Sequence, residues 1–176
     1  MRLRYFCSVL ALVAVGCAAH SSLLPADVPT HTLSIRWQRL VNASDKTCPR
    51  CASTEQEVTK AVAHLKQSLA PAGIAVTAEA ERMDEATFLA APLESNRIWI
   101  NGRPLEDWLG AQTASSACSG CCGAGTQCRT VALGGETYEA IPAGLIVRAG
   151  FLAAGKVLQE EPSNPASGVP GFGGEH

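Results

Sequence analysis

Two cysteines separated by two residues, Cys48 and Cys51, stand between a strand-like and a helix-like segment, and this arrangement constrains the fold more than any other feature. Apolar and polar residues alternate over residues 33–38, which is the period-two pattern of a strand. Apolar residues then recur at helical spacing over residues 58–69. A thiol at a helix start lies near unpaired backbone N–H groups and the positive end of the helix dipole, and both favour its thiolate. The sequence therefore predicts a reactive dithiol at a strand-to-helix junction.

The rest of the chain continues the alternation of strands and helices. The sequence predicts strands at 74–81, 97–100 and 103–105, helices at 84–90 and 106–114, a hairpin at 129–141 and a last helix at 142–158. Asn101-Gly102 and Gly134-Gly135 are turn signals, and Pro142 suits the first turn of a helix. A chain of 176 residues with 47% hydrophobic content is long enough for one domain with its own core.

The N-terminal segment has the pattern of an export signal. Two arginines near the N-terminus precede an apolar run over residues 5–15, which is too short to span a bilayer. This run ends in Ala14-Val15-Gly16-Cys17, which resembles a bacterial lipobox. We therefore expect residues 1–16 to be a lipoprotein-type signal peptide and Cys17 to be lipidated, with cleavage near Ala18-Ala19 as the alternative. Either cleavage predicts an exported protein of the bacterial cell envelope or periplasm, and lipidation would anchor it to the membrane.

The mature chain is expected to hold one domain between two irregular segments. Residues 17–31 have the composition of a tether, and residues 32–159 form the domain. Residues 160–176 are rich in Pro, Ser and Gly and are expected to be disordered. The formal net charge is −2, and acidic and basic residues are mixed along the chain without a basic stripe. This pattern argues against binding of nucleic acid.

Export determines how the cysteines are interpreted, because disulfides persist in oxidising compartments. Of the eight cysteines, Cys7 leaves with the signal and Cys17 is acylated, so six remain. A Ser/Gly/Cys-rich insertion at residues 115–128 holds four of them: Cys118, Cys121, Cys122 and Cys128. Adjacent cysteines rarely pair with each other, so we expect Cys121 and Cys122 to pair with Cys118 and Cys128 in some order. Alternatively, the insertion folds over the Cys48 pair and relays electrons, or it binds a soft metal such as Zn, Cu or a heavier thiophilic ion.

The order of strand, Cys-Pro-x-Cys, helix and strand, followed by Asn96-Arg97-Ile98-Trp99-Ile100-Asn101-Gly102, resembles the glutaredoxin-like members of the thioredoxin superfamily. The resemblance covers residues 33–114. It implies a thioredoxin-like, three-layer α/β fold with a central mixed sheet. To this fold the chain adds the Cys-rich loop, a hairpin and a C-terminal helix.

One position departs from that superfamily. Thioredoxin-like proteins usually place a cis-proline just before the third strand, facing the dithiol, whereas this chain has Glu94-Ser95-Asn96 there and its nearest proline is Pro92. A cis peptide bond without proline costs about 3 kcal/mol. We therefore expect a trans loop with altered substrate docking, from which the side chain of Ser95 or Asn96 faces the sulfurs.

A narrower resemblance, over residues 33–150, is to a bacterial and archaeal family catalogued as a domain of unknown function. It rests on these blocks: Trp37-Gln38-Arg39-Leu40, Thr47-Cys48-Pro49-Arg50-Cys51, Asn96 to Gly102, Cys118 to Cys122, and Cys128-Arg129. This resemblance implies no established activity.

Together these features favour thiol–disulfide chemistry, as in a thiol–disulfide oxidoreductase, without an organic cofactor. Cys48 would be the nucleophile, and Cys51, one turn further along, would be the resolving thiol. Pro49 fits the first helical turn because it has no N–H to leave unpaired. The positive charge of Arg50 would stabilise the thiolate and make the couple more oxidising. The partner would be a redox protein or a small thiol.

Two other functions use the same residues. In the first, the clustered cysteines of the insertion, Cys118, Cys121, Cys122 and Cys128, hold a thiolate-bound soft metal in the envelope. In the second, every cysteine is locked in a structural disulfide. The sequence has no phosphate-binding Gly-rich loop and no H-E-x-x-H motif, so it gives no support to nucleotide-binding or metalloprotease functions.

Overall fold

The computed structural model describes residues 29–118 and 125–160. The expected signal peptide, Cys17, most of the tether, Cys121-Cys122 and the tail from residue 161 lie outside these ranges. The elements are β1 (His31–Leu40), α1 (Pro49–Leu69), η1 (Ala70–Ala72), β2 (Ile74–Met83), α2 (Glu85–Ala90), η2 (Pro92–Glu94), β3 (Arg97–Ile100), β4 (Arg103–Pro104), α3 (Leu105–Leu109), β5 (Gln112–Ala117), β6 (Gln127–Leu133), β7 (Glu136–Tyr138) and α4 (Ala143–Gln159), where η denotes a short 3-10 helix. The predicted alternation of strands and helices as far as α3, the hairpin and the last helix are confirmed.

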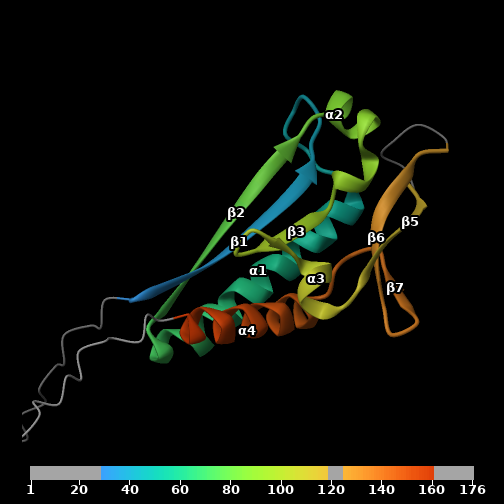
Figure 1. Cartoon of the computed structure of the whole chain (residues 1–176). Coiled ribbons are helices and arrows are strands. Elements are labelled where there is room, and N and C mark those ends of the chain that lie inside the picture. The colour runs from blue at the N-terminus through green and yellow to red at the C-terminus, as the bar shows by residue number, and fades with distance from the viewer. Residues whose placement is uncertain (1–28, 119–124, 161–176) are drawn as a thin grey trace, which may run out of the picture.

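Strand β1 lies inside a four-stranded mixed sheet with the order β2-β1-β3-β4 (Figure 1). β2 runs parallel to β1, and β3 runs antiparallel to it. In this register Leu33 of β1 pairs with Val76 of β2, and Trp37 of β1 pairs with Ile98 of β3. The mixed sheet is the one predicted, and it is compatible with a thioredoxin-like α/β fold.

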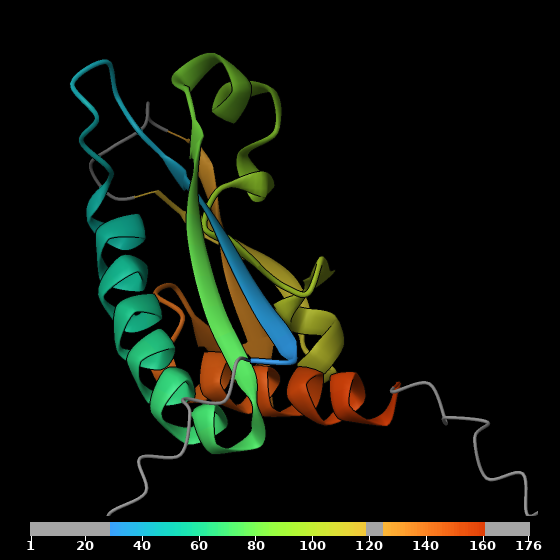
Figure 2. The same cartoon turned by 90° about the vertical axis from the view of Figure 1, so that its left-hand side faces the viewer.

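Helices α1 and α4 cover one face of this sheet (Figure 2). Ile35 of β1 is buried in one core with Leu65 of α1 and Ile146 of α4, whereas Ser34 and Arg36 on the opposite face of β1 are exposed. The third layer of the expected fold is short. The segment between β2 and β3, all of it described, forms only α2 and η2, which lie at the upper end of the sheet in Figure 1.

A second sheet, with the order β5-β6-β7, lies on the β3 side of the first, away from β2 (Figure 1). Here the prediction of a helix to residue 114 is wrong. α3 ends at Leu109 because Gly110 takes a left-handed φ of 66°, a common helix end. β5 then pairs antiparallel with β6, with Ser116 opposite Cys128, so the Cys-rich loop begins later than residue 115. None of the helices in the described part of the chain is long and apolar enough to cross a membrane.

Candidate functional site: the Cys48–Cys51 dithiol

The chain between β1 and α1 is a closed turn that leads into Cys48. Asn42 organises this turn, because its side-chain oxygen accepts hydrogen bonds from two backbone N–H groups within it, each at 2.9 Å. An isolated β-bridge joins Val41 to Thr47 and holds the two ends of the turn together. The turn therefore fixes the point at which α1 begins.

Cys48 is the N-cap of α1, and its sulfur accepts a hydrogen bond from the backbone N–H of Cys51 at 3.4 Å. The sulfur thus lies at the positive end of a 21-residue helix, which stabilises a thiolate. Pro49 is the first helical residue, where its missing N–H leaves no unpaired donor. Both cysteines are present as thiols, with Cys48 7% exposed and Cys51 2% exposed. Cys48 is therefore the more accessible of the two residues.

The acidity of Cys51 is set by its neighbour. Its hydrogen bond with Cys48 and its burial raise the pKa of the Cys51 thiol far above its ordinary range. The Leu40 backbone and the Thr47 side chain lower this pKa by a smaller amount. Cys51 therefore holds its proton more tightly than an ordinary cysteine.

Arg50 reaches away from the start of α1 to the second sheet. Its Nη2 lies 2.9 Å from Oε1 of Glu139 and donates to the carbonyl of Ala117 at 3.2 Å. The Arg50 side chain is 9% exposed, and its Nη1 is buried without a hydrogen-bond partner among the described residues. The positive charge expected to act on the thiolate is therefore shared with a carboxylate. Arg50 also ties the helix that carries the dithiol to the second sheet.

Asn96, directly before β3, contacts the same glutamate. It has a left-handed φ of 57°, is 2% exposed, and donates from Nδ2 to the carbonyl of Glu139 at 3.1 Å. Its Oδ1 is buried, with no hydrogen-bond partner in the described part of the chain. Arg50 and Asn96 thus hold Glu139 between the first turn of α1 and the start of β3. The segment around Glu139 therefore covers the residue that stands where thioredoxin-like proteins place their cis-proline.

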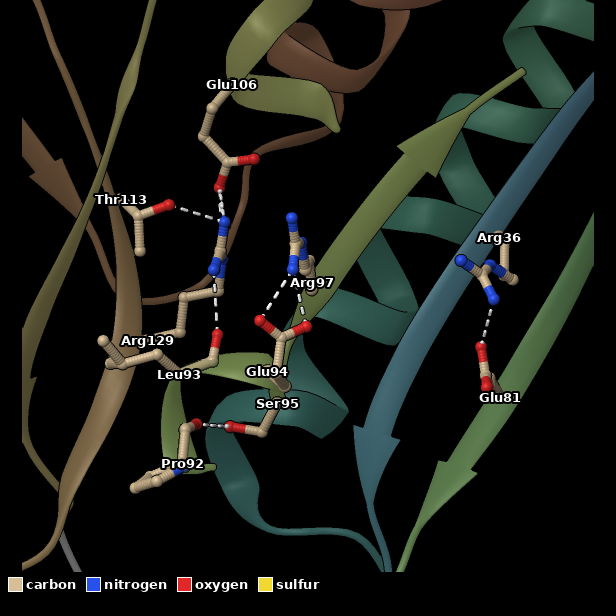
Figure 3. Close-up of polar contacts among 10 residues, drawn as sticks. All are labelled: Arg36, Glu81, Pro92, Leu93, Glu94, Ser95, Arg97, Glu106, Thr113 and Arg129. Carbon is tan, nitrogen blue, oxygen red and sulfur yellow. Dashed lines mark hydrogen bonds and ion pairs between the residues drawn. The ribbon is translucent and has the colours of Figure 1, made fainter. Parts of the chain in front are cut away.

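Further polar contacts hold the loop before β3 (Figure 3). The Ser95 hydroxyl donates to the carbonyl of Pro92 at 2.8 Å, and Arg97 pairs with Glu94 at 2.6 Å. No cis peptide bond occurs in the residues that the structure describes. Ser95, one of the two side chains expected to face the sulfurs, is therefore engaged within its own loop.

Arg129 of β6 joins this loop to α3 through a buried ion pair that the sequence analysis missed. It pairs with Glu106, and the two side chains are 4% and 6% exposed. Arg129 also donates to the carbonyl of Leu93 at 2.8 Å and to Oγ1 of Thr113 at 2.7 Å (Figure 3). The available signal was weak: Arg129 is the one charged residue of β6, and Glu106 is one of two acidic residues in α3, and buried charges need partners.

Cys118 and Cys128 form a disulfide at the end of the β5–β6 hairpin where the loop between the two strands begins. This differs from the expected pairing of each with Cys121 or Cys122, which lie outside the described residues. Strand pairing explains the difference: Cys118 directly follows β5, and Cys128 of β6 pairs with Ser116, two residues before Cys118, so the register brings the two cysteines together. The bridge packs with Leu40, the residue whose backbone contacts Cys51. The disulfide and the dithiol therefore lie at the same end of the molecule.

The cysteines of the insertion were also the candidate metal ligands. The disulfide uses two of them, Cys118 and Cys128. Within residues 29–118 and 125–160, no group of three or more His, Cys, Asp or Glu side chains is placed to hold a metal ion.

Comparison with known proteins agrees with the narrower resemblance. Residues 33–150, from β1 into α4, match the family described as "Domain of unknown function (DUF2703)". A protein of Archaeoglobus fulgidus described as uncharacterized is 39% identical over 114 residues, which cover 65% of this chain and 82% of that protein. No solved structure gives a significant match. The chain therefore belongs to the DUF2703 family.

Proposed function

We propose that this protein carries out thiol–disulfide exchange through Cys48 and Cys51, as an exported protein held at the cell envelope by Cys17. The observation that carries the proposal is the position of the Cys48 sulfur. It caps α1, accepts the N–H of Cys51, and belongs to the more exposed of the two cysteines. A thiolate at a helix N-terminus is the reactive form in thiol exchange.

The reaction proceeds in two balanced steps. The Cys48 thiolate attacks one sulfur of a substrate disulfide, forms a mixed disulfide with it and displaces the other sulfur as a thiolate. Cys51 then loses its proton and attacks the Cys48 sulfur, which releases the second substrate thiolate. The products are a Cys48–Cys51 disulfide and two substrate thiols, so two electrons pass from the protein to the substrate.

The raised pKa of Cys51 suits the resolving role. A protonated Cys51 donates to the Cys48 thiolate and is a poor nucleophile until that negative charge is consumed in the mixed disulfide. The helix N-terminus stabilises the reduced form of the couple, which makes the Cys48–Cys51 disulfide a stronger oxidant than one without it.

The test is reduction of bis(2-hydroxyethyl) disulfide by the reduced protein. We expect Cys48→Ser to abolish the reaction and Cys51→Ser to stop at a mixed disulfide that mass spectrometry maps to Cys48. The matched control, Cys118→Ser, keeps the reaction and loses mainly stability. Equal, small effects of Cys48→Ser and Cys118→Ser would contradict the proposal. The metal content of anaerobically purified protein tests the alternative. A stoichiometric soft metal that is lost when Cys48 is alkylated would show that the function is metal binding and not thiol–disulfide exchange.

A further inference from the structure

A groove leads from Cys48 along the β1–α1 turn to α2. Its first part is a cavity of about 370 Å³, lined by Cys48 and Glu85 among others. Its second part, of about 750 Å³, continues from Glu85 to Leu89. Val41, Asn42 and Glu85 line both cavities, so the two adjoin, and together they are called the Cys48–Leu89 groove.

The approach to the dithiol from the start of β3 is covered by the segment around Glu139. Arg50 binds Glu139 and the carbonyl of Ala117, and Asn96 binds the carbonyl of Glu139. These contacts place the segment around Glu139 between α1 and the start of β3. Ser95 and Asn96 are each 2% exposed, so a substrate cannot use the backbone before β3 as a docking strand. Within the residues that the structure describes, the Cys48–Leu89 groove offers an approach to Cys48.

The walls of the groove are preformed. On one side, Asp45 in the β1–α1 turn lies 3.4 Å from the guanidinium of Arg82, which ties the turn to the end of β2. On the other side, the carboxylate of Asp84 accepts the backbone N–H of Thr87 at 2.8 Å and caps α2. A groove held on both sides loses little conformational entropy when it is filled.

The dimensions and the far end of the groove indicate what fills it. The 370 Å³ cavity beside Cys48 alone has the size of a small-molecule site. The second cavity extends to Leu89, which is 61% exposed and lies about 6 Å further along α2 than Glu85. A small thiol would fill only the first cavity. A polypeptide also reaches the second and covers the apolar side chain there.

We propose that the Cys48–Leu89 groove binds an extended peptide segment of a protein disulfide. The substrate cysteine lies at Cys48, and an apolar side chain two or three residues away packs on Leu89. A basic side chain between them faces Glu85. Two basic residues also line the groove: Arg82 is paired with Asp45, and Lys46 lines the first cavity with Cys48. This inference names the substrate class of the proposed exchange and rests on it.

The experiment compares two substrates. One is a short peptide, cyclised by a disulfide, with lysine next to a cysteine and leucine one residue further; the other is bis(2-hydroxyethyl) disulfide. We expect Leu89→Ser to lower the second-order rate constant for reduction of the peptide by the reduced protein about tenfold, because it removes the leucine contact that the bound peptide would bury. The reaction with the small disulfide is expected to stay unchanged. Leu158→Ser is the matched control, because Leu158 is 44% exposed on α4, away from the groove.

A charge reversal sharpens the test. Glu85→Lys is expected to slow the reaction of the lysine peptide and to speed the reaction of a peptide with glutamate at that position. Glu79→Lys is the control and changes neither rate, because Glu79 is also exposed but lies outside the groove. Equal effects of Leu89→Ser and Leu158→Ser on the peptide would overturn the groove and leave the exchange intact. Failure of Cys48 to react with either disulfide would overturn the exchange itself, and the groove with it.

Discussion

At the scale of single residues, Cys51 makes the stability of the reduced protein depend on pH. Its pKa is raised in the folded state by its hydrogen bond with Cys48 and by burial, whereas an unfolded cysteine ionises near pH 8.5. Above that pH, the folded state therefore binds more protons than the unfolded state. The contribution of the protonated Cys51 thiol to the free energy of unfolding is fully present below the pKa of the unfolded cysteine, and it is lost as the pH rises above that pKa.

We expect the free energy of unfolding of the reduced protein, measured in urea, to fall as the pH is raised from about 8 to about 10. Cys51→Ser removes the titrating group, and its stability should vary less over the same range. A slope that Cys51→Ser leaves unchanged would show that another group causes it.

The ion pair of Arg129 with Glu106 is a second effect of single residues. Arg129→Met leaves the Glu106 carboxylate buried without its partner, which should lower the free energy of unfolding by about 3–5 kcal/mol. The control is Arg36→Gln, because Arg36 and Glu81 form a pair whose side chains are 46% and 43% exposed, and such pairs contribute at most about 1 kcal/mol. Urea unfolding of both variants measures the difference. Similar losses in the free energy of unfolding of the two variants would mean that the burial of an ion pair does not determine how much its removal destabilises the protein.

At the scale of elements, the disulfide between Cys118 and Cys128 fixes the end of the β5–β6 hairpin. Their sequence separation is 10, and a bridge closing such a loop contributes about 3 kcal/mol. Cys118→Ser should therefore lower stability by about that amount. The alkylation rate of Cys48 should stay the same, because its cap and turn belong to β1 and α1. A large change in that rate would instead indicate that the two cysteine pairs exchange electrons or depend on each other structurally.

The contact between α1 and α4 depends on one glycine. A Cβ atom on Gly150 would lie 2.7 Å from Cδ1 of Leu65, which is fully buried, whereas a Cβ on Gly155 would meet nothing within 4 Å. Gly150→Ala should therefore destabilise the protein by about 1–3 kcal/mol through overpacking. Gly155→Ala should stabilise it by about 0.5–1 kcal/mol, because alanine favours the helix. Thermal unfolding compares the two, and a gain in both would show that α1 and α4 separate easily.

At the scale of the whole molecule, the sequence predicts the first sheet well because its elements carry local signals. Period-two and helical patterns mark β1 and α1, and Asn101-Gly102 marks the turn before β4. The second sheet has weaker signals. β5 (Gln112–Ala117) is polar and small, so its pairing is set by β6 rather than by its own periodicity.

In the candidate site too, the local features could be predicted from the sequence and the long-range contacts could not. The cap at Cys48 is a local feature of the strand–turn–helix sequence, so its place could be predicted. The contacts of Arg50 and Asn96 with Glu139 join segments that are far apart in the chain, and no local pattern encodes them. The buried pair of Arg129 with Glu106 likewise joins β6 to α3. Long-range polar contacts therefore account for most of what the sequence analysis missed.

The overall shape also sets how an anchored protein would present its dithiol. The chain enters β1 where Thr30 donates to the carbonyl of Gly73, and the 10 residues of β1 carry it about 30 Å to the turn before Cys48 (Figure 1). Lipidation at Cys17 would thus hold the end of the domain opposite the dithiol. We expect Cys17→Ala to move the protein from the membrane fraction to the soluble fraction. Cys48 in the vesicle-bound lipidated form should react with a bulky soluble maleimide at the rate measured for Cys17→Ala. A much slower reaction in vesicles would mean that the dithiol faces the membrane and that its substrates lie there.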